Sequence, residues 1–410
     1  MFYRGNFLSL GEHLLIPPKI MKRILLAICV IALSALSYGQ DINQRAFTFA
    51  WLSDVHLNSF AYAEDDLRQS IEDINANPDV AFTILSGDVT EFGDTKEFYL
   101  LQDILKDFRK PYFLIPGNHD VNWSENGCTM FDKIFQASHF CYDWQGVRFI
   151  GCGAGPSLRM GPPHIPREEI LWLDSIVRAT PAKQPIIFIN HFPLNRDLSN
   201  WYEVIDILKT RNIQAVLGGH LHVNHAYDAE GIPAVLGRSS LRREDPIGGY
   251  NLVTFRGNTL EFQERIIKTE THPVWHTILL APLQKKRDTT YYRPDFTIND
   301  KYPSVRESWK LKDVTDIASQ GSIDGDLYVY TNTAGVVHAL NVADGKTLWT
   351  YTTGNKIFSA PFITPRLVII SSCDGFIYAL DRKQGTVRWR YNTNYPIVAC
   401  PLVSEDIVYI

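Results

Sequence analysis

Three features are scarce in this sequence: an excess of positive charge, cysteines at metal-binding spacing, and long apolar runs. The 410 residues carry a net charge of -5, so no basic surface supports binding to nucleic acid. None of the six cysteines forms a Cys-x-x-Cys pair, which argues against a cysteine metal site. The apolar run near the N-terminus, residues 24–33, is too short for a comfortable membrane span. The rest of the composition is that of an ordinary globular protein, and the chain is long enough for two or three domains.

Residues 21–39 have the layout of a secretory signal peptide. A basic start at residues 21–23 precedes the apolar run, and small residues lead to Gly39, after which we expect cleavage. We therefore expect a periplasmic or secreted protein, with an uncleaved anchor as the alternative. Residues 1–20 make little sense before a signal peptide, so we interpret them as an extension upstream of the true start. In an oxidising compartment one or two disulfides can form, but their pairing is not readable.

Five strand-like apolar runs each end in polar residues that can bind metal or transfer protons. The most informative run, residues 111–116, leads into Gly117-Asn118-His119-Asp120. The blocks that follow the other runs are Asp54-Val55-His56, Gly87-Asp88, His191 and Gly218-Gly219-His220-Leu221-His222. Strands of an α/β sheet bring their carboxyl ends to one edge, where ligands bind, so we expect these blocks to converge. A plain turn explains any one block, but not all five together.

The polar blocks supply the donors for a pair of metal ions. Two cations about 3.5–4 Å apart need roughly seven or eight protein donors, including a bridging carboxylate. The candidate ligands are Asp54, His56, Asp88, Asn118, His191, His220 and His222. Imidazole, carboxylate and amide donors suit Fe, Mn or Zn better than Ca or Mg, and the lack of thiolates argues against a structural zinc site. No pair has the helical HExxH spacing, so the donors must come from separate strands.

Strand-like and helix-like patterns alternate along the first part of the chain. Helices are expected at residues 64–76, 94–108, 167–178 and 200–210. This alternation indicates an α/β fold, a sheet covered by helices, and the shorter, more antiparallel strands after Leu221 indicate a second sheet packed against it. We expect this domain to cover residues 41–268 and an irregular linker to cover residues 269–305.

Residues 306–410 repeat with a spacing of 40. Trp309, Trp349 and Trp389 are in register, and strand-sized pieces fill each unit. A period near 40 with several short strands and one recurring tryptophan indicates β-propeller blades. About two and a half units are present, whereas a closed propeller needs at least about four blades. We therefore expect a partial propeller from a longer reading frame.

The ordered blocks D-x-H, G-D, G-N-H-D, H and G-H-x-H resemble the calcineurin-like metallophosphoesterases over residues 46–268. The stretch from Gly87 to Thr90, with Gly93 and Glu97 beyond it, looks like the class III cyclic-nucleotide phosphodiesterase branch. The resemblance implies a four-layer α/β/β/α sandwich. It also implies one metal ion held by Asp54, His56, Asp88 and His222. A second ion would be held by Asp88, Asn118, His191 and His220. The repeats are similar to those of quinoprotein-like β-propellers, in Ala339–Trp349 and Ala379–Trp389.

The same resemblance implies a metal-dependent phosphoesterase in which a hydroxide bridging two ions attacks phosphorus. His119 would act as general acid or stabilise the transition state, and Asp120 would orient its imidazole, with an Asx turn as the alternative for Asp120. The alternative function is an inactive binding protein whose propeller docks a partner, and the intact donor set weighs against it.

The substrate stays open between a phosphomonoester and a phosphodiester, on a small molecule or a headgroup. Several loop residues near the motif ends could contact it, although a packing role is the better interpretation of each. These residues are Trp123, Arg159, His164, Asn195 and Arg196.

Overall fold

The computed structural model describes residues 46–58, 60–122, 124–155, 162–242, 245–281 and 291–410. The expected leader at residues 21–39 and the extension before it lie outside the described residues. Within the described part of the chain, no helix is long and apolar enough to span a membrane. The five cysteines that the structure describes are all free.

One six-stranded sheet joins the beginning and the end of the first domain, in the order β12-β11-β10-β1-β2-β3. Its strands are β1 (Ala46–Leu52), β2 (Val80–Ser86), β3 (Tyr112–Ile115), β10 (Gly249–Arg256), β11 (Thr259–Ile266) and β12 (Glu270–Leu279). The first three are parallel, and the last three continue the sheet as an antiparallel meander from β1. The parallel part therefore delivers the ends of β1, β2 and β3 to one edge.

The second six-stranded sheet has the order β4-β5-β6-β7-β9-β8. Its strands are β4 (His139–Trp144), β5 (Val147–Cys152), β6 (Ile186–Ile189), β7 (Ile213–Gly218), β8 (His225–Ala229) and β9 (Ile232–Leu236). The four central strands are parallel, and the edge strands β4 and β8 are antiparallel to their neighbours. The ends of β6 and β7 thus carry His191 and the block that starts at Gly218.

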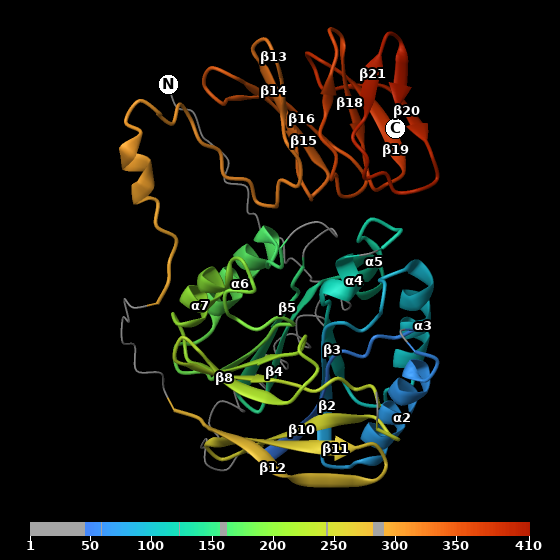
Figure 1. Ribbon diagram of the computed structural model, residues 1–410, viewed down its shortest axis with the longest axis vertical. Helices are drawn as coiled ribbons and strands as arrows, with labels where there is room; N and C mark the ends of the chain where they lie inside the picture. The colour runs from blue at the N-terminus through green and yellow to red at the C-terminus, as the bar shows by residue number, and fades with distance from the viewer. Residues whose placement is uncertain (1–45, 59, 123, 156–161, 243–244, 282–290) are drawn as a thin grey trace, which may run out of the picture.

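Helices cover the outer face of each sheet, and the inner faces pack on each other (Figure 1). The helices are α2 (Ala63–Ala76), α3 (Thr95–Leu105), α5 (Met130–Phe135), α6 (Arg167–Ala179) and α7 (Trp201–Leu208). Buried side chains of α2, α3 and α5 pack on the first sheet, and those of α6 and α7 pack on the second. Between the sheets, Phe49 and Phe82 stack with ring centroids 5.2 Å apart. Burying such a ring contributes roughly 1.5–3 kcal/mol. The expected four-layer sandwich and its four helices are confirmed.

Glu97, part of the resemblance to the phosphodiesterase branch, has a structural task at the start of α3. Asp94 accepts a hydrogen bond from the Glu97 backbone, and the Glu97 side chain accepts one from the Asp94 backbone. The same carboxylate accepts the Phe92 N–H at 2.9 Å. This reciprocal cap satisfies amide groups at the helix start, and it also fixes the loop that follows β2.

The expectation of an irregular linker over residues 269–305 is wrong at its beginning. Strand β12 occupies Glu270–Leu279 and pairs with β11 along its length, so the sheet extends beyond residue 268. Its side chains are mostly exposed, as expected of an edge strand, and this leaves too little apolar alternation to predict it. Further on, residues 282–290 lie outside the described residues, and a 3₁₀ helix, η2, covers Thr297–Lys301.

Two four-stranded antiparallel sheets and the start of a third follow (Figure 1). They consist of β13 (Ser322–Asp324), β14 (Leu327–Thr331), β15 (Val336–Asn341) and β16 (Thr347–Thr352), then β17 (Phe362–Ile363), β18 (Leu367–Ser371), β19 (Phe376–Asp381) and β20 (Val387–Asn392), then β21 (Leu402–Ser404) and β22 (Ile407–Tyr409). The Trp309 indole donates to the Val342 carbonyl at 2.7 Å, and the Trp349 indole donates to the Arg382 carbonyl at 2.9 Å. Both acceptors lie 33 positions after the donor, so the predicted blade register is confirmed.

Candidate dinuclear metal centre

Most of the expected metal ligands have a left-handed backbone. The φ angles of Asp54, His56, Asp88, His220 and His222 are 50°, 46°, 50°, 70° and 61°. Such values are uncommon for residues other than glycine, and they persist only where the surrounding structure imposes them. Each of these residues follows the end of β1, β2 or β7. The left-handed turns break the alternation of the strand and bring neighbouring donors to the same side.

Glycines beside the ligands allow the loops to approach closely. A Cβ atom at Gly117 would lie 2.2 Å from Oδ1 of Asp88, and one at Gly219 would lie 1.9 Å from Oγ of Ser53 and 2.5 Å from Oδ2 of Asp54. No side chain fits at either position. The glycines of the G-N-H-D and G-H-x-H blocks are therefore required by the packing of the site.

The first group of donors consists of Asp54, His56 and His222, whose ligand atoms lie within 4.8 Å of one another. Nε2 of His222 lies 3.3 Å from Oδ1 of Asp54 and 3.1 Å from Nε2 of His56. Nδ1 of His56 donates to Oε2 of Glu91 at 2.8 Å, so its Nε2 is the nitrogen that faces the group. A carboxylate behind a histidine in this way sets the tautomer that binds a metal.

The second group consists of Asp88, His191 and His220, also within 4.8 Å of one another. Nδ1 of His191 donates to the Ser86 carbonyl at 2.9 Å, and its Nε2 lies 3.1 Å from Oδ2 of Asp88. Oδ1 of Asn118, the remaining expected ligand of this group, is buried and has no hydrogen-bond partner among the described residues. A buried amide oxygen without a partner is costly unless something else binds it.

Asp88 joins the two groups. Its Oδ2 lies 3.1 Å from His191 and 3.8 Å from Nε2 of His56, and its Oδ1 accepts the His119 backbone N–H at 2.9 Å. This is the position expected of a carboxylate that bridges two ions. With the buried Asn118 oxygen and two preset histidine tautomers, the donors fit a dinuclear metal centre.

Burial dominates the electrostatics of the ligands. It raises the pKa of Asp54 to about 7 and lowers the pKa of His56 to about 3 and that of His220 to about 4. Burial alone would also raise the pKa of Asp88, but the charge and hydrogen bond of His191 hold it below its usual range. The neutral imidazoles of His56 and His220 and the carboxylate of Asp88 are forms that bind cations, whereas the charge and hydrogen bond of Asp88 outweigh burial and raise the pKa of His191 to about 9.

His119 stands at the opening of the site. Its Nδ1 donates to the Glu91 carbonyl at 2.6 Å, and its ring meets the ring of His56 edge-on at 4.6 Å between centroids. Its side chain is 29% exposed, unlike the buried ligands His56 and His191. The Nε2 atom is therefore the nitrogen left to act on a substrate.

The expected role of Asp120 needs a correction. Its carboxylate is buried and accepts the N–H groups of Gly117, Val89 and Thr90 and the hydroxyl of Thr90, at 2.7–3.2 Å. None of the contacts described for this carboxylate reaches the His119 imidazole. Asp120 instead joins the loop after β2 to the loop after β3, and Glu91 is the residue that orients His119.

Glu91 is the residue that the sequence analysis missed. Its carboxylate accepts from His56, and its carbonyl accepts from His119. The available signal was its position in the Gly87-Asp88 block, three residues beyond Asp88. From the sequence alone, Glu91 cannot be distinguished from an ordinary charged loop residue. Only the fold brings its carboxylate next to His56.

The loop residues considered for substrate contact have mixed outcomes. Trp123 and Arg159 lie outside the described residues. Nε2 of His164 lies 3.0 Å from Oδ2 of Asp316, between the two domains, and the Arg196 guanidinium lies over the Tyr292 ring at 5.5 Å. For His164 and Arg196 the structure therefore gives a packing role.

Two families match the chain. Residues 47–224 match the calcineurin-like phosphoesterases, and residues 303–409 match the family of the outer membrane protein assembly factor BamB. All seven expected metal ligands fall within the first match. The second match covers the blades.

Relatives of the first segment are named as phosphodiesterases. A probable glycerophosphodiester phosphodiesterase GpdQ from Arcobacter nitrofigilis is 26% identical over 204 residues, which are 42% of this chain and 70% of the relative. A probable cyclic nucleotide phosphodiesterase from Fibrobacter succinogenes is 22% identical over 262 residues, which are 56% of this chain and 95% of the relative. Among solved structures, a dimetal phosphatase from Danio rerio aligns with a TM-score of 0.45 at 13% identity, over 57% of this chain and 99% of that one.

Proposed function

We propose, from the premise that residues 47–224 belong to the calcineurin-like metallophosphoesterases, that this chain hydrolyses phosphodiesters in the periplasm or outside the cell. The chain is a metal-dependent phosphoesterase. The choice of diester and the location are the parts that we propose. The location rests on the signal-peptide pattern of residues 21–39.

The observation that carries the proposal is the position of Asp88 between two groups of donors. The Asp54, His56 and His222 group lies on one side of it, and the His191 and His220 group lies on the other. Two divalent cations held there would neutralise phosphate oxygens and lower the pKa of a bound water enough for attack on phosphorus.

Three residues that are not expected metal ligands have separate roles in the reaction. Glu91 holds His56 and His119 in place, through its side chain and its carbonyl respectively. His119 is exposed at the site opening, where its Nε2 can donate a proton to the departing oxygen. Asp120 keeps the loop of Asn118 and His119 against the end of β2.

Large apolar side chains beside the ligands favour a diester over a monoester. Phe92, Leu221 and Val223 are 49%, 51% and 50% exposed, and they adjoin Glu91 and His222 in the chain. A phosphomonoester has one organic substituent, whereas a phosphodiester has a second that such side chains can contact. The relatives named as phosphodiesterases point the same way.

The test is hydrolysis of bis-p-nitrophenyl phosphate and p-nitrophenyl phosphate by chelator-treated protein, with and without added Mn²⁺. We expect Mn²⁺ to restore hydrolysis, with a higher kcat/KM for the diester. A higher kcat/KM for the monoester would contradict the choice of diester. No metal-dependent hydrolysis of either compound would favour the alternative, a binding protein whose propeller docks a partner.

A further inference from the structure

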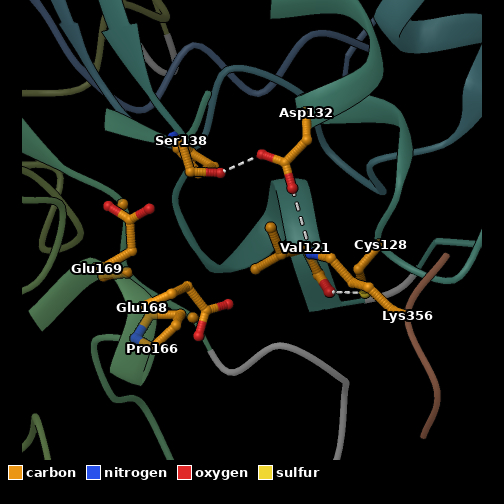
Figure 2. Close-up of a pocket in the computed structure, with 12 residues that line it drawn as sticks. Val121, Cys128, Asp132, Ser138, Pro166, Glu168, Glu169 and Lys356 are labelled. Atoms are coloured by element: carbon orange, nitrogen blue, oxygen red, sulfur yellow. Dashed lines mark hydrogen bonds and ion pairs between the residues drawn. The ribbon is translucent and has the colours of Figure 1, made fainter. Parts of the chain in front are cut away.

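A small cavity of about 100 Å³ lies where the loop between the first and second blades meets the first domain (Figure 2). Its wall includes Asp132 of α5, Glu168 and Glu169 of α6, and Lys356 of this loop. The carboxylate of Glu169 has a partner within the first domain, since its Oε1 accepts a hydrogen bond from His139 at 2.8 Å. Lys356 is the cation that the second domain adds to this acidic wall.

Lys356 makes a charged contact across the domain boundary. Its Nζ lies 3.3 Å from Oδ2 of Asp132, whose Oδ1 accepts the Ser138 hydroxyl at 2.6 Å (Figure 2). Burial would lower the pKa of Lys356, but the nearby Asp132 outweighs it and leaves the pKa raised, so the side chain is an ammonium. Oε2 of Glu168 is buried in the same wall without a hydrogen-bond partner among the described residues, and burial raises the pKa of this carboxyl group.

The cavity also touches both ends of the segment that carries Asn118 and His119. Pro116 precedes this segment and Val121 follows it, and both line the cavity. The carbonyl of Val121 accepts the thiol of Cys128, which lines the cavity beside Lys356 (Figure 2). Helix α4 (Asn118–Asn122) therefore lines the same cavity as Lys356.

Other contacts hold the blades in this position. Asp316 accepts the backbone N–H of Arg167 at 3.2 Å and pairs with His164 at 3.0 Å. A Cβ atom at Gly127 would lie 2.8 Å from Sγ of Cys373, so the loop before α5 packs directly on the second blade. The ammonium group is thus held against α5 by a docked surface, rather than by one flexible side chain.

We propose that Lys356, in the loop between the first and second blades, is a positioning residue for the reaction that holds in place the segment carrying Asn118 and His119. The inference rests on the proposed hydrolysis, because its test measures that reaction. A displacement of about 1 Å in a catalytic group can reduce the rate by up to about 100-fold. A contact that fixes the position of the segment carrying Asn118 and His119 can therefore control turnover. A merely structural ion pair would change stability and leave turnover unchanged.

The experiment compares Lys356→Met, Asp132→Asn and the double variant in the full chain. We expect each single variant to lower kcat for bis-p-nitrophenyl phosphate by about tenfold, with two metal ions still bound and with KM within twofold. The double variant should lose no more than either single variant, since both remove the same contact. Lys356→Arg should recover most of the lost kcat.

The control is Lys346→Met, because Lys346 is 81% exposed and pairs only locally with Asp344 among the described residues. Its kcat should equal that of the wild type. If Lys356→Met lowers the melting temperature but leaves kcat within twofold, the inference is wrong while the hydrolase assignment stands. If the wild type shows no metal-dependent hydrolysis, the proposed function fails instead.

Discussion

The pKa values of two buried carboxylates of the site shift in opposite directions. Burial raises the pKa of Asp54 to about 7, whereas His191 outweighs burial and holds the pKa of Asp88 below its usual range. The difference comes from position, since Asp88 faces the His191 imidazole at 3.1 Å and both oxygens of Asp54 accept the single backbone N–H of His220. Asp88 is thus the anionic centre of the cluster, as a bridging ligand must be.

Replacing His119 and replacing Asp88 should have different effects on turnover and metal content. We expect His119→Ala to lower kcat by about 10²–10⁴-fold while both metals remain bound, because loss of a general acid affects only the reaction. Asp88→Ala should lose both metals as well as activity. Metal analysis of the two purified variants checks the division of roles, and equal metal loss in both would refute it.

Glu91 should matter although it is not a ligand. Glu91→Gln keeps the size of the side chain but weakens the hydrogen bond from Nδ1 of His56. We expect metal affinity or kcat to fall by about 10–100-fold, as for other residues that orient metal-binding histidines. Thr95 is partly buried at the start of α3, and Thr95→Ser keeps the hydroxyl that accepts from Asn126, so this variant serves as a control. Wild-type activity in Glu91→Gln would show that His56 needs no orientation.

At the scale of elements, the strand ends were predictable and the loop geometry was not. Runs such as residues 47–53 and 213–217 are apolar because both faces of the strands are buried, and the polar blocks mark where that burial ends. The left-handed turns at Asp54 and His220 and the reach of Glu91 depend on contacts between β1, β2 and β7. Those contacts are long-range, so no local pattern encodes them. For the same reason the sequence predicted that Asp120 orients His119, with an Asx turn as the alternative, and gave no sign of its bonds to the loop after β2.

Gly219 tests the packing of the β7 loop. Gly219→Ala would place a Cβ 1.9 Å from Oγ of Ser53 and 2.5 Å from Oδ2 of Asp54, so the ligand has to move. We expect weaker metal binding and a loss of stability of about 1–3 kcal/mol from overpacking. Gly231→Ala is the control, because no atom of the described residues lies within 4 Å of the added Cβ, although the positive φ of Gly231 is unfavourable for alanine. Metal titration of both variants should show a loss in Gly219→Ala alone.

At the scale of the whole molecule, the contact between the domains should depend on pH. The hydrogen bond to Asp316 raises the pKa of His164, with further support from Glu168 and opposition from burial. A raised folded-state pKa means that the pair stabilises fully below the unfolded value of about 6.5, and that this is lost as pH rises through the folded value.

The check is the melting temperature of wild type and of His164→Gln at pH 6 and pH 9. The wild type should exceed the variant at pH 6, and the difference should shrink at pH 9. An equal difference at both pH values would show that the His164 charge contributes nothing to the docked arrangement.

The blades show which structural features a sequence repeat can predict. The tryptophan register and the strand positions followed from a period of 40, because each blade reproduces the same local contacts. The contact of the loop between the two blades with α5 had no such signal, since Lys356 has no counterpart in the repeat and lies far from Asp132 in the chain. Repeats therefore predict the blades but not their attachment.

The most direct test of the central claim is an anomalous difference map from crystals grown with Mn²⁺. Two peaks about 3.5–4 Å apart are expected, one beside Asp54, His56 and His222 and one beside Asn118, His191 and His220, with Asp88 between them. A map with no peak among these residues would contradict the account.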